Sequence, residues 1–258
     1  MVVKIYDTNE AQSKILQQKI QNEKIHYFFK PKKELTEIFD QVQQPTILLS
    51  VINPYIIPTK ILNNPNIKAI NCHPALLPKH PGRNVEAWTI FERDNVAGVT
   101  WHTITPVIDS GKILIQKKLF LDDSFTSIKL MKQLNDLAFV AFTQIFEKVI
   151  NEKEIGFSES RPTRNKIHFS WEKPNAGYLD LSWEGEKISA FLRAMDYGIL
   201  EFLGKPKLML DDECFTWKRY KILKDTNRKE EKLEFTNSMI RIIKPDYEFE
   251  LRDYSTIT

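Results

Sequence analysis

Glycine is scarce in this 258-residue chain, which has eight glycines, the first of them Gly82. Glycine-rich turns hold the phosphates in dinucleotide-binding and P-loop proteins, and such turns therefore cannot lie in the N-terminal region. This absence excludes NAD, FAD and ATP as expected cofactors.

Cysteines and long apolar runs are also lacking. Cys72 and Cys214 lie far apart with no CxxC pairing, which argues against a disulfide framework and a zinc site. No apolar stretch approaches the ~20 residues needed to cross a bilayer, and the N-terminus lacks the features of a signal peptide. We therefore expect a cytoplasmic protein with free thiols, no metal and no membrane partner.

The charge balance shows no strong excess of one sign. A net charge of +3 is well below the concentrated positive field typical of nucleic-acid binding. Nucleic acid is not an expected partner, whereas an anionic small substrate would suit this charge.

Strand-like and helix-like segments alternate through the first part of the chain. The almost continuous apolar run at 46–52 is typical of a strand covered on both faces, as in a parallel sheet. Further strands are predicted at 2–6, 25–29, 67–71, 98–104 and 113–120, and helices at 11–22, 33–43, 84–93 and 126–151. This alternation predicts an α/β fold with a doubly wound, mostly parallel, Rossmann-like sheet.

The pattern of predicted elements changes after a turn-rich stretch at 156–175. One helix is predicted at 185–195, followed by short strands at 207–210, 214–223, 232–236, 238–243 and 247–254. We expect two domains, a catalytic domain over residues 1–155 and a small β-rich domain over residues 156–258. An open, OB-like barrel is one arrangement of the second domain.

Two polar side chains end one of the predicted strands. Residues 70–84 read INCHPALLPKHPGRN. Asn71 and His73 are two positions apart, so their side chains point the same way, and Pro74 ends the strand directly after them. Ligands bind at the carboxyl edge of open α/β sheets. We therefore expect a site at this edge.

This segment resembles the Asn-x-His-Pro-(Ser/Ala)-Leu-Leu-Pro signature of the formyltetrahydrofolate-dependent formyltransferases. A second stretch, 98–114, reads GVTWHTITPVIDSGKIL and is similar to that family's Gly-Val-Thr strand and (Ile/Leu)-Asp-x-Gly loop. The two motifs occur in order, with a Trp88-containing helix between them. The resemblance extends over about residues 46–206.

The resemblance implies a catalytic set of Asn71, His73 and Asp109. His73 would take the proton of an attacking amine as general base, since an imidazole is matched to neutral pH. Asp109 would orient that ring, and Asn71 would donate to the oxyanion of the tetrahedral species. Taken alone, each residue also has a structural explanation, such as an Asx turn before Gly111 for Asp109. His102 alternates with Trp101 on a predicted strand, which leaves packing and function open.

The resemblance also implies that 10-formyltetrahydrofolate is the formyl donor and that it lies beside these residues. Its pterin would be enclosed by two loops, through Ile52, Asn53, Tyr55, Ile57, Val107 and Ile108. For Tyr55 and Ile57, simple core packing is the alternative. The acceptor would meet Lys79, Arg83 and Asn84, which a solvated loop would equally explain.

The expected acceptor is a small-molecule amine. Residues 191–208 resemble the C-terminal region of amino-sugar N-formyltransferases and the formylation domains of nonribosomal peptide synthetases, and the methionyl-tRNA enzymes more distantly. A nucleotide-activated amino sugar, of a surface-glycan or nonulosonic acid pathway, is therefore the expected acceptor. The alternatives are an aminoacyl group on a carrier protein or methionyl-tRNA, and a non-catalytic folate-binding module. Whether the protein forms a homodimer is left open.

The chain departs from the family pattern in one respect. Asn71 lies closer to the start than in typical members, which implies that about one βα unit is missing or compressed. This departure affects the expected acceptor contacts and leaves Asn71, His73 and Asp109 intact.

Overall fold

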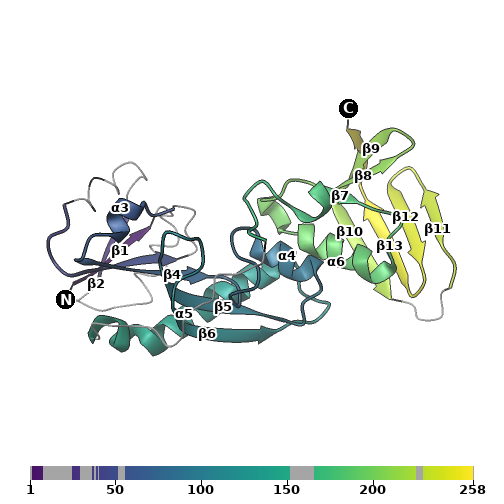
Figure 1. Cartoon of the computed structure of the whole chain (residues 1–258). Helices are drawn as coiled ribbons and strands as arrows, with labels where there is room; N and C mark the ends of the chain where they lie inside the picture. Colours follow the sequence, from purple (N-terminus) through teal and green to yellow (C-terminus); the bar gives the residue numbers. More distant parts are fainter. Residues whose placement is uncertain are drawn as a thin grey trace. The chain divides into compact units, whose positions relative to one another are not determined.

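The computed structural model describes residues 2–7, 25–29, 37, 39, 41–51, 56–151, 166–224 and 229–257. The chain forms two compact units (Figure 1). Unit 1 comprises residues 1–82, 97–119 and 133–167, and unit 2 comprises residues 83–96, 120–132 and 168–258. Because segments of both units alternate along the chain, the proposed domains at 1–155 and 156–258 stay a prediction.

A six-stranded sheet forms the centre of unit 1. Its strands are β1 (Val2–Asp7), β2 (Ile25–Phe29), β3 (Thr46–Val51), β4 (Ile67–His73), β5 (Val96–Thr103) and β6 (Ile113–Phe120), in the order β2-β1-β3-β4-β5-β6. The pairs β1–β2, β1–β3 and β3–β4 are parallel, and β4–β5 is antiparallel. The predicted α/β fold with a mostly parallel sheet is confirmed.

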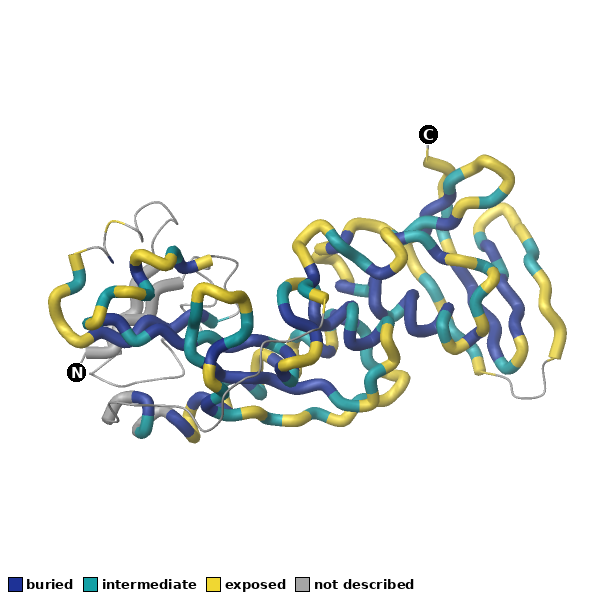
Figure 2. The backbone as a smooth tube through the Cα atoms, viewed as in Figure 1, coloured by how far each residue is buried: buried dark blue, intermediate teal, exposed yellow. Residues whose placement is uncertain are grey.

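Apolar residues cover both faces of this sheet. Residues 46–50 of β3 are all buried, as the continuous apolar run predicted (Figure 2). On one face, helix α5 (Ser127–Asn151) packs against Trp101, whose Nε1–H donates to the Ala138 carbonyl at 3.0 Å. On the other face lies a core cluster near the short helix α3 (Thr59–Leu62), made of Phe39, Leu48, Ile57, Ile61, Ile67 and Ala69. Strands β3 and β4 are therefore largely buried.

Unit 2 combines helices with two small sheets. Its helices are α4 (Val85–Phe91), α6 (Gly185–Met195), η1 (Pro174–Gly177) and η2 (Gly198–Leu200). Helix α6 packs against α4, and the Lys187 ammonium donates to the Phe91 carbonyl at 2.7 Å. At the start of α6, a Cβ on Gly185 would lie 2.4 Å from the Tyr247 ring, so this helix approaches strand β13 (Tyr247–Arg252) as only glycine permits.

The C-terminal strands confirm the predicted β-rich region. One sheet has the order β14-β9-β8-β7, and the other has the order β10-β13-β12-β11. Their bounds are β7 (Tyr178–Leu179), β8 (Lys207–Leu210), β9 (Glu213–Thr216), β10 (Arg219–Lys224), β11 (Lys232–Phe235), β12 (Met239–Lys244), β13 (Tyr247–Arg252) and β14 (Ser255–Ile257). These strands form two sheets in the described part of the chain, instead of the single open barrel considered above.

Most other predicted elements agree with the structure to within a few residues. The predicted strand at 214–223 divides into β9 and β10, and the one at 247–254 corresponds to β13, which ends two residues earlier at Arg252. The predicted helix at 11–22 lies outside the described residues, and only part of the one at 33–43 is described. Among the described helices, none combines the length and the apolar character that crossing a bilayer requires.

Candidate active site

Four polar side chains share one face of the sheet at the end of β4. This strand ends at His73, directly before Pro74, as the sequence predicted. In the antiparallel pairing with β5, Asn71 lies opposite His102, and His73 lies opposite Thr100. Because facing residues of paired strands share a side, all four project from the face opposite to α5.

The loop between β5 and β6 brings Asp109 back over this face. Asp109 has a left-handed backbone conformation, with φ of 51°. At the base of the loop, the Thr103 N–H donates to the Lys112 carbonyl at 2.9 Å. A Cβ on Gly111 would lie only 1.6 Å from the Thr103 carbonyl oxygen, so only glycine fits there. The (Ile/Leu)-Asp-x-Gly pattern is thus explained by a tight return of the chain.

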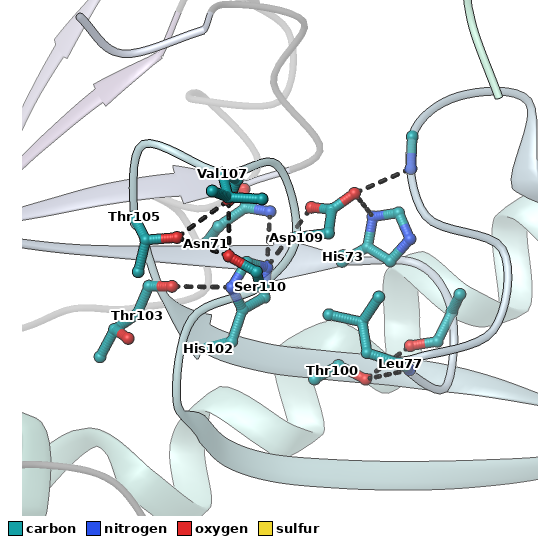
Figure 3. A network of polar contacts seen from close by, with 12 residues as sticks. Asn71, His73, Leu77, Thr100, His102, Thr103, Thr105, Val107, Asp109 and Ser110 are labelled. Atoms are coloured by element: carbon teal, nitrogen blue, oxygen red, sulfur yellow. Dashed lines mark hydrogen bonds and ion pairs between the residues drawn. The ribbon is translucent and has the colours of Figure 1, made fainter. Parts of the chain in front are cut away.

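The Asp109 carboxylate lies between two imidazoles (Figure 3). Its Oδ2 is 3.5 Å from Nδ1 of His73 and accepts the Gly82 N–H at 2.8 Å. Its Oδ1 is 3.6 Å from Nε2 of His102. The side chain is only 9% exposed. The structure therefore brings the three predicted catalytic residues together in unit 1.

The second nitrogen of His73 contacts the backbone. Its Nε2–H donates to the carbonyl oxygen of His80 at 2.8 Å, and His80 itself has φ of 48°. The ring is 3% exposed. His73 is thus held between a carboxylate on one side and a peptide carbonyl on the other.

Burial and the nearby charges move the pKa values of this pair. Burial lowers the pKa of His73 more than the Asp109 charge and the His80 hydrogen bond raise it, so the net direction is downward. Burial raises the pKa of Asp109, but His73, His102 and the Gly82 N–H together lower it further, and the net direction is also downward. Near neutral pH, both shifts favour an ionised Asp109 beside a neutral imidazole, which can act as a base.

The amide of Asn71 meets the ring of His102. Asn71 Nδ2 lies 3.2 Å from His102 Nε2, and His102 Nδ1 lies 2.8 Å from the Thr103 carbonyl oxygen. Figure 3 shows Asn71 and His102 on one side of Asp109 and His73 on the other. His102 is 2% exposed, whereas Asn71 is partly exposed, so this contact is partly buried.

Thr100 supports the segment that follows His73. Its hydroxyl donates to the Ala75 carbonyl at 2.6 Å and accepts the Leu77 N–H at 3.0 Å. Gln116 donates to the same hydroxyl oxygen at 2.9 Å and to the Leu77 carbonyl at 2.8 Å. These buried bonds tie the loop after β4 to the neighbouring strands.

The predicted folate contacts differ in how the structure places them. Ile52, Asn53 and Tyr55 lie outside the described residues. Ile57 is buried in the core cluster near α3. Val107 and Ile108 are 59% and 38% exposed in the loop that carries Asp109. The folate contacts of all six stay predictions.

The predicted acceptor contacts fall in both units. Lys79 is exposed in unit 1, whereas Arg83 and Asn84 belong to unit 2. The Asn84 amide donates to the Glu172 carbonyl at 2.7 Å and to the Ser170 carbonyl at 3.3 Å. This amide therefore supports the loop at 169–172, and its contact with an acceptor stays a prediction.

Sequence reasoning missed the backbone groups of this site. The His80 carbonyl and the Gly82 N–H contact His73 and Asp109, yet neither contact depends on a side chain. A Pro-Gly pair such as Pro81-Gly82 is typical of a turn, and Gly82 has φ of 99°. A turn signal does not indicate which groups the turn will meet.

The family model described as "Formyl transferase" matches residues 4–145, more than half of the chain. The chain belongs to the formyl transferase family. Among its curated relatives, the methionyl-tRNA formyltransferase of Ehrlichia ruminantium (strain Gardel) is 31% identical over 124 residues, 48% of this chain and 41% of the relative. The GDP-perosamine N-formyltransferase of Brucella melitensis is 26% identical over 115 residues, 45% of this chain and 44% of the relative. The chain thus matches less than half the length of these relatives.

Two solved structures resemble this chain over nearly its whole length. WlaRD, a sugar 3N-formyltransferase solved with dTDP and 5-N-formyl-THF, has a TM-score of 0.71 at 16% identity, covering 98% of this chain and 97% of its own. The N-formyltransferase of Helicobacter canadensis, solved with folinic acid and dTDP-3-aminofucose, has a TM-score of 0.70 at 14% identity, covering 98% and 99%. At these identities the likeness confirms the fold.

Proposed function

We propose that this formyl transferase moves the formyl group of 10-formyltetrahydrofolate to the primary amine of a nucleotide-linked amino sugar. The observation that carries the proposal is the set of Asn71, His73 and Asp109, brought together by strand β4 and the β5–β6 loop of a formyl transferase fold. Family membership supports the reaction, because this set supplies the groups that formyl transfer needs.

The reaction moves one proton and one acyl group. The donor supplies a formyl carbon bonded to N10 of the folate. The acceptor nitrogen forms a bond to that carbon and loses a proton, and the N10–carbon bond breaks as N10 gains one. His73 can take the first proton and return it to N10, acting first as base and then as acid. Asn71 can donate an N–H to the oxyanion between these steps, a contribution of about 3 kcal/mol.

Asp109 prepares His73 for this role. Its carboxylate lies beside Nδ1, where it favours the tautomer with a proton on Nδ1 and stabilises the imidazolium formed in the reaction. With the proton on Nδ1, the Nε2 lone pair is the basic site. In the structure, Nε2–H donates to the His80 carbonyl, so catalysis requires the acceptor amine to take the place of that carbonyl.

Three observations support an amino-sugar acceptor. The two sugar N-formyltransferase structures cover this chain through its C-terminal region, whereas the methionyl-tRNA relative matches 124 residues. Both structures were solved with dTDP or a dTDP-linked sugar. A net charge of +3 suits a nucleotide diphosphate better than a transfer RNA.

The test is formyl transfer from 10-formyltetrahydrofolate to a panel of amines, with the formylated product detected by mass spectrometry. The panel contains dTDP- and GDP-linked amino sugars, an aminoacyl carrier protein and methionyl-tRNA. We expect turnover on a nucleotide amino sugar, and loss of turnover in His73→Ala. Turnover on methionyl-tRNA alone, or on the carrier protein alone, would show that the acceptor is not an amino sugar but an aminoacyl group. If the protein binds folate but formylates none of these amines, it is better described as a non-catalytic folate-binding module.

The matched control is Asp212→Asn, which changes an exposed carboxylate in a unit 2 turn. It should retain wild-type turnover, whereas Asp109→Asn should not. Equal rates for the wild type and His73→Ala would refute the mechanism.

A further inference from the structure

His102 lies directly opposite Asn71 in the β4–β5 pairing, and both side chains project from the same face. A buried histidine on a strand is commonly a packing residue. Here, however, each ring nitrogen has a polar neighbour, and one of these neighbours is the proposed oxyanion donor.

The two hydrogen bonds of His102 define its tautomer. Because a carbonyl oxygen can only accept, the 2.8 Å contact with Thr103 requires the proton on Nδ1. In the neutral ring, Nε2 then carries a lone pair, which can accept an N–H from the Asn71 amide at 3.2 Å. The backbone carbonyl of Thr103 therefore sets the polarity of the ring edge that Asn71 meets.

That polarity determines which end of the Asn71 amide faces His102. A side-chain amide has a nitrogen with two N–H groups and a carbonyl oxygen, and the reversed orientation would place that oxygen against the Nε2 lone pair. With Nδ2 facing His102, one N–H is used in this bond and the second remains on the same nitrogen. Only a nitrogen held in place can present an N–H to the oxyanion without reorganising.

Asp109 competes for the same edge of the His102 ring, because its negative charge favours a proton on Nε2 over a lone pair. Its Oδ1 lies 3.6 Å from His102 Nε2, while its Oδ2 faces His73. A proton on Nε2 of His102 would point toward this carboxylate and remove the acceptor that Asn71 uses. With Nε2 unprotonated, His102 accepts the N–H of Asn71, and the Asp109 carboxylate faces His73.

We propose that His102 is a positioning residue, which holds the amide nitrogen of Asn71 in the orientation that stabilises the oxyanion. It acts through Asn71 and touches neither the donor nor the acceptor. This proposal rests on the proposed function, because it assigns His102 to the formyl-transfer step.

The experiment compares two substitutions at His102. In His102→Gln, the side-chain oxygen can occupy the place of Nε2 and accept from Asn71. In His102→Asn, the shorter side chain can reach Thr103 but offers no acceptor to Asn71. We expect His102→Asn to lower kcat by about 10- to 100-fold, less than the loss of the oxyanion donor itself. We expect the KM values to stay near wild type and His102→Gln to recover most of kcat.

A double-mutant cycle separates positioning from packing. If His102 acts through Asn71, adding His102→Asn to Asn71→Ala should cause little further loss of kcat. Independent, multiplying losses, or equal losses in the Gln and Asn variants, would overturn the proposal. Thermal unfolding of each variant checks that the fold is retained.

A second readout does not depend on turnover. In ¹⁵N spectra of the wild-type protein, we expect His102 to show a protonated Nδ1 and an unprotonated Nε2. A protonated Nε2 in the neutral ring would reject the assignment even in an active enzyme. Conversely, a wild-type protein that formylates no amine, but shows the expected tautomer, would contradict the proposed function and leave the Asn71–His102 geometry standing.

Discussion

Nε2 of His73 lies 2.8 Å from the carbonyl oxygen of His80, so the proposed base is covered by its own loop. The opposite ring nitrogen faces Asp109 at 3.5 Å, slightly beyond ordinary hydrogen-bond length. In this state the ring proton lies on Nε2. An amine that displaces the carbonyl would leave Nε2 open and move the ring proton toward Asp109.

The pH dependence of catalysis follows from the His73–Asp109 pair. His73 must be neutral to accept a proton, and burial lowers its pKa more than Asp109 raises it. The acid limb of kcat/KM should therefore lie below the ordinary histidine value of about 6.5. In Asp109→Asn the raising contribution is lost, so this limb should move to still lower pH while kcat falls by about 10²- to 10⁴-fold. A pH series of kcat/KM for both proteins measures the shift, and movement of the limb to higher pH would contradict it.

Stability should also depend on pH through His73. Its pKa in the folded protein is lower than in the unfolded chain, so the unfolded chain binds the proton more readily. The stabilising contribution is present above about pH 6.5 and is lost as the pH falls toward the folded-state pKa. Asp109 has a lowered pKa as well, but its contribution is lost only in a more acidic range.

We therefore expect Tm to decrease between pH 7 and pH 5, and to decrease less in His73→Gln. Calorimetry at several pH values measures both changes. A variant as sensitive to acid as the wild type would assign the effect to other groups.

Gly111→Ala tests the tight return of the Asp109 loop. A Cβ there would overlap the Thr103 carbonyl, so the loop must open and carry the carboxylate away from His73. We expect kcat/KM to fall by about 100-fold, the usual cost of displacing a catalytic group by 1 Å. Gly198→Ala is the matched control, since a Cβ at Gly198 meets no atom within 4 Å. It should cost about 1–2 kcal/mol of stability through its positive φ and leave turnover per folded molecule unchanged.

Thr100→Val tests the support beneath the His73 loop. Valine keeps the shape of threonine but removes the hydroxyl that bonds to Ala75, Leu77 and Gln116. Leaving buried partners unpaired should lower the free energy of unfolding by about 1–3 kcal/mol. Thr143→Val removes an exposed hydroxyl on α5 and should change stability little. Chemical denaturation measures both, and equal effects would show that the Thr100 bonds do not support the loop.

Sequence patterns predicted the parts of this protein in which one local signal dominates. The apolar run in β3, the long periodic stretch of α5 and the Asn71–His73 spacing each determine local structure. The contact of Asn71 with His102 could not be predicted, because these residues are 31 positions apart and meet only through the antiparallel pairing of β4 and β5. The His73–His80 contact was hidden for another reason, since a backbone carbonyl is present at every position and only the loop path selects one.

The antiparallel pairing of β4 and β5 has a consequence for how activity appears during folding. Shifting β5 by one position would turn His102 and Thr100 toward α5 and bring Trp101 to the opposite side. A chain with native strands but the wrong alignment would therefore keep its secondary structure and lose its chemistry. In refolding experiments, recovery of turnover should report the correct alignment of these two strands, later than any signal from helix content.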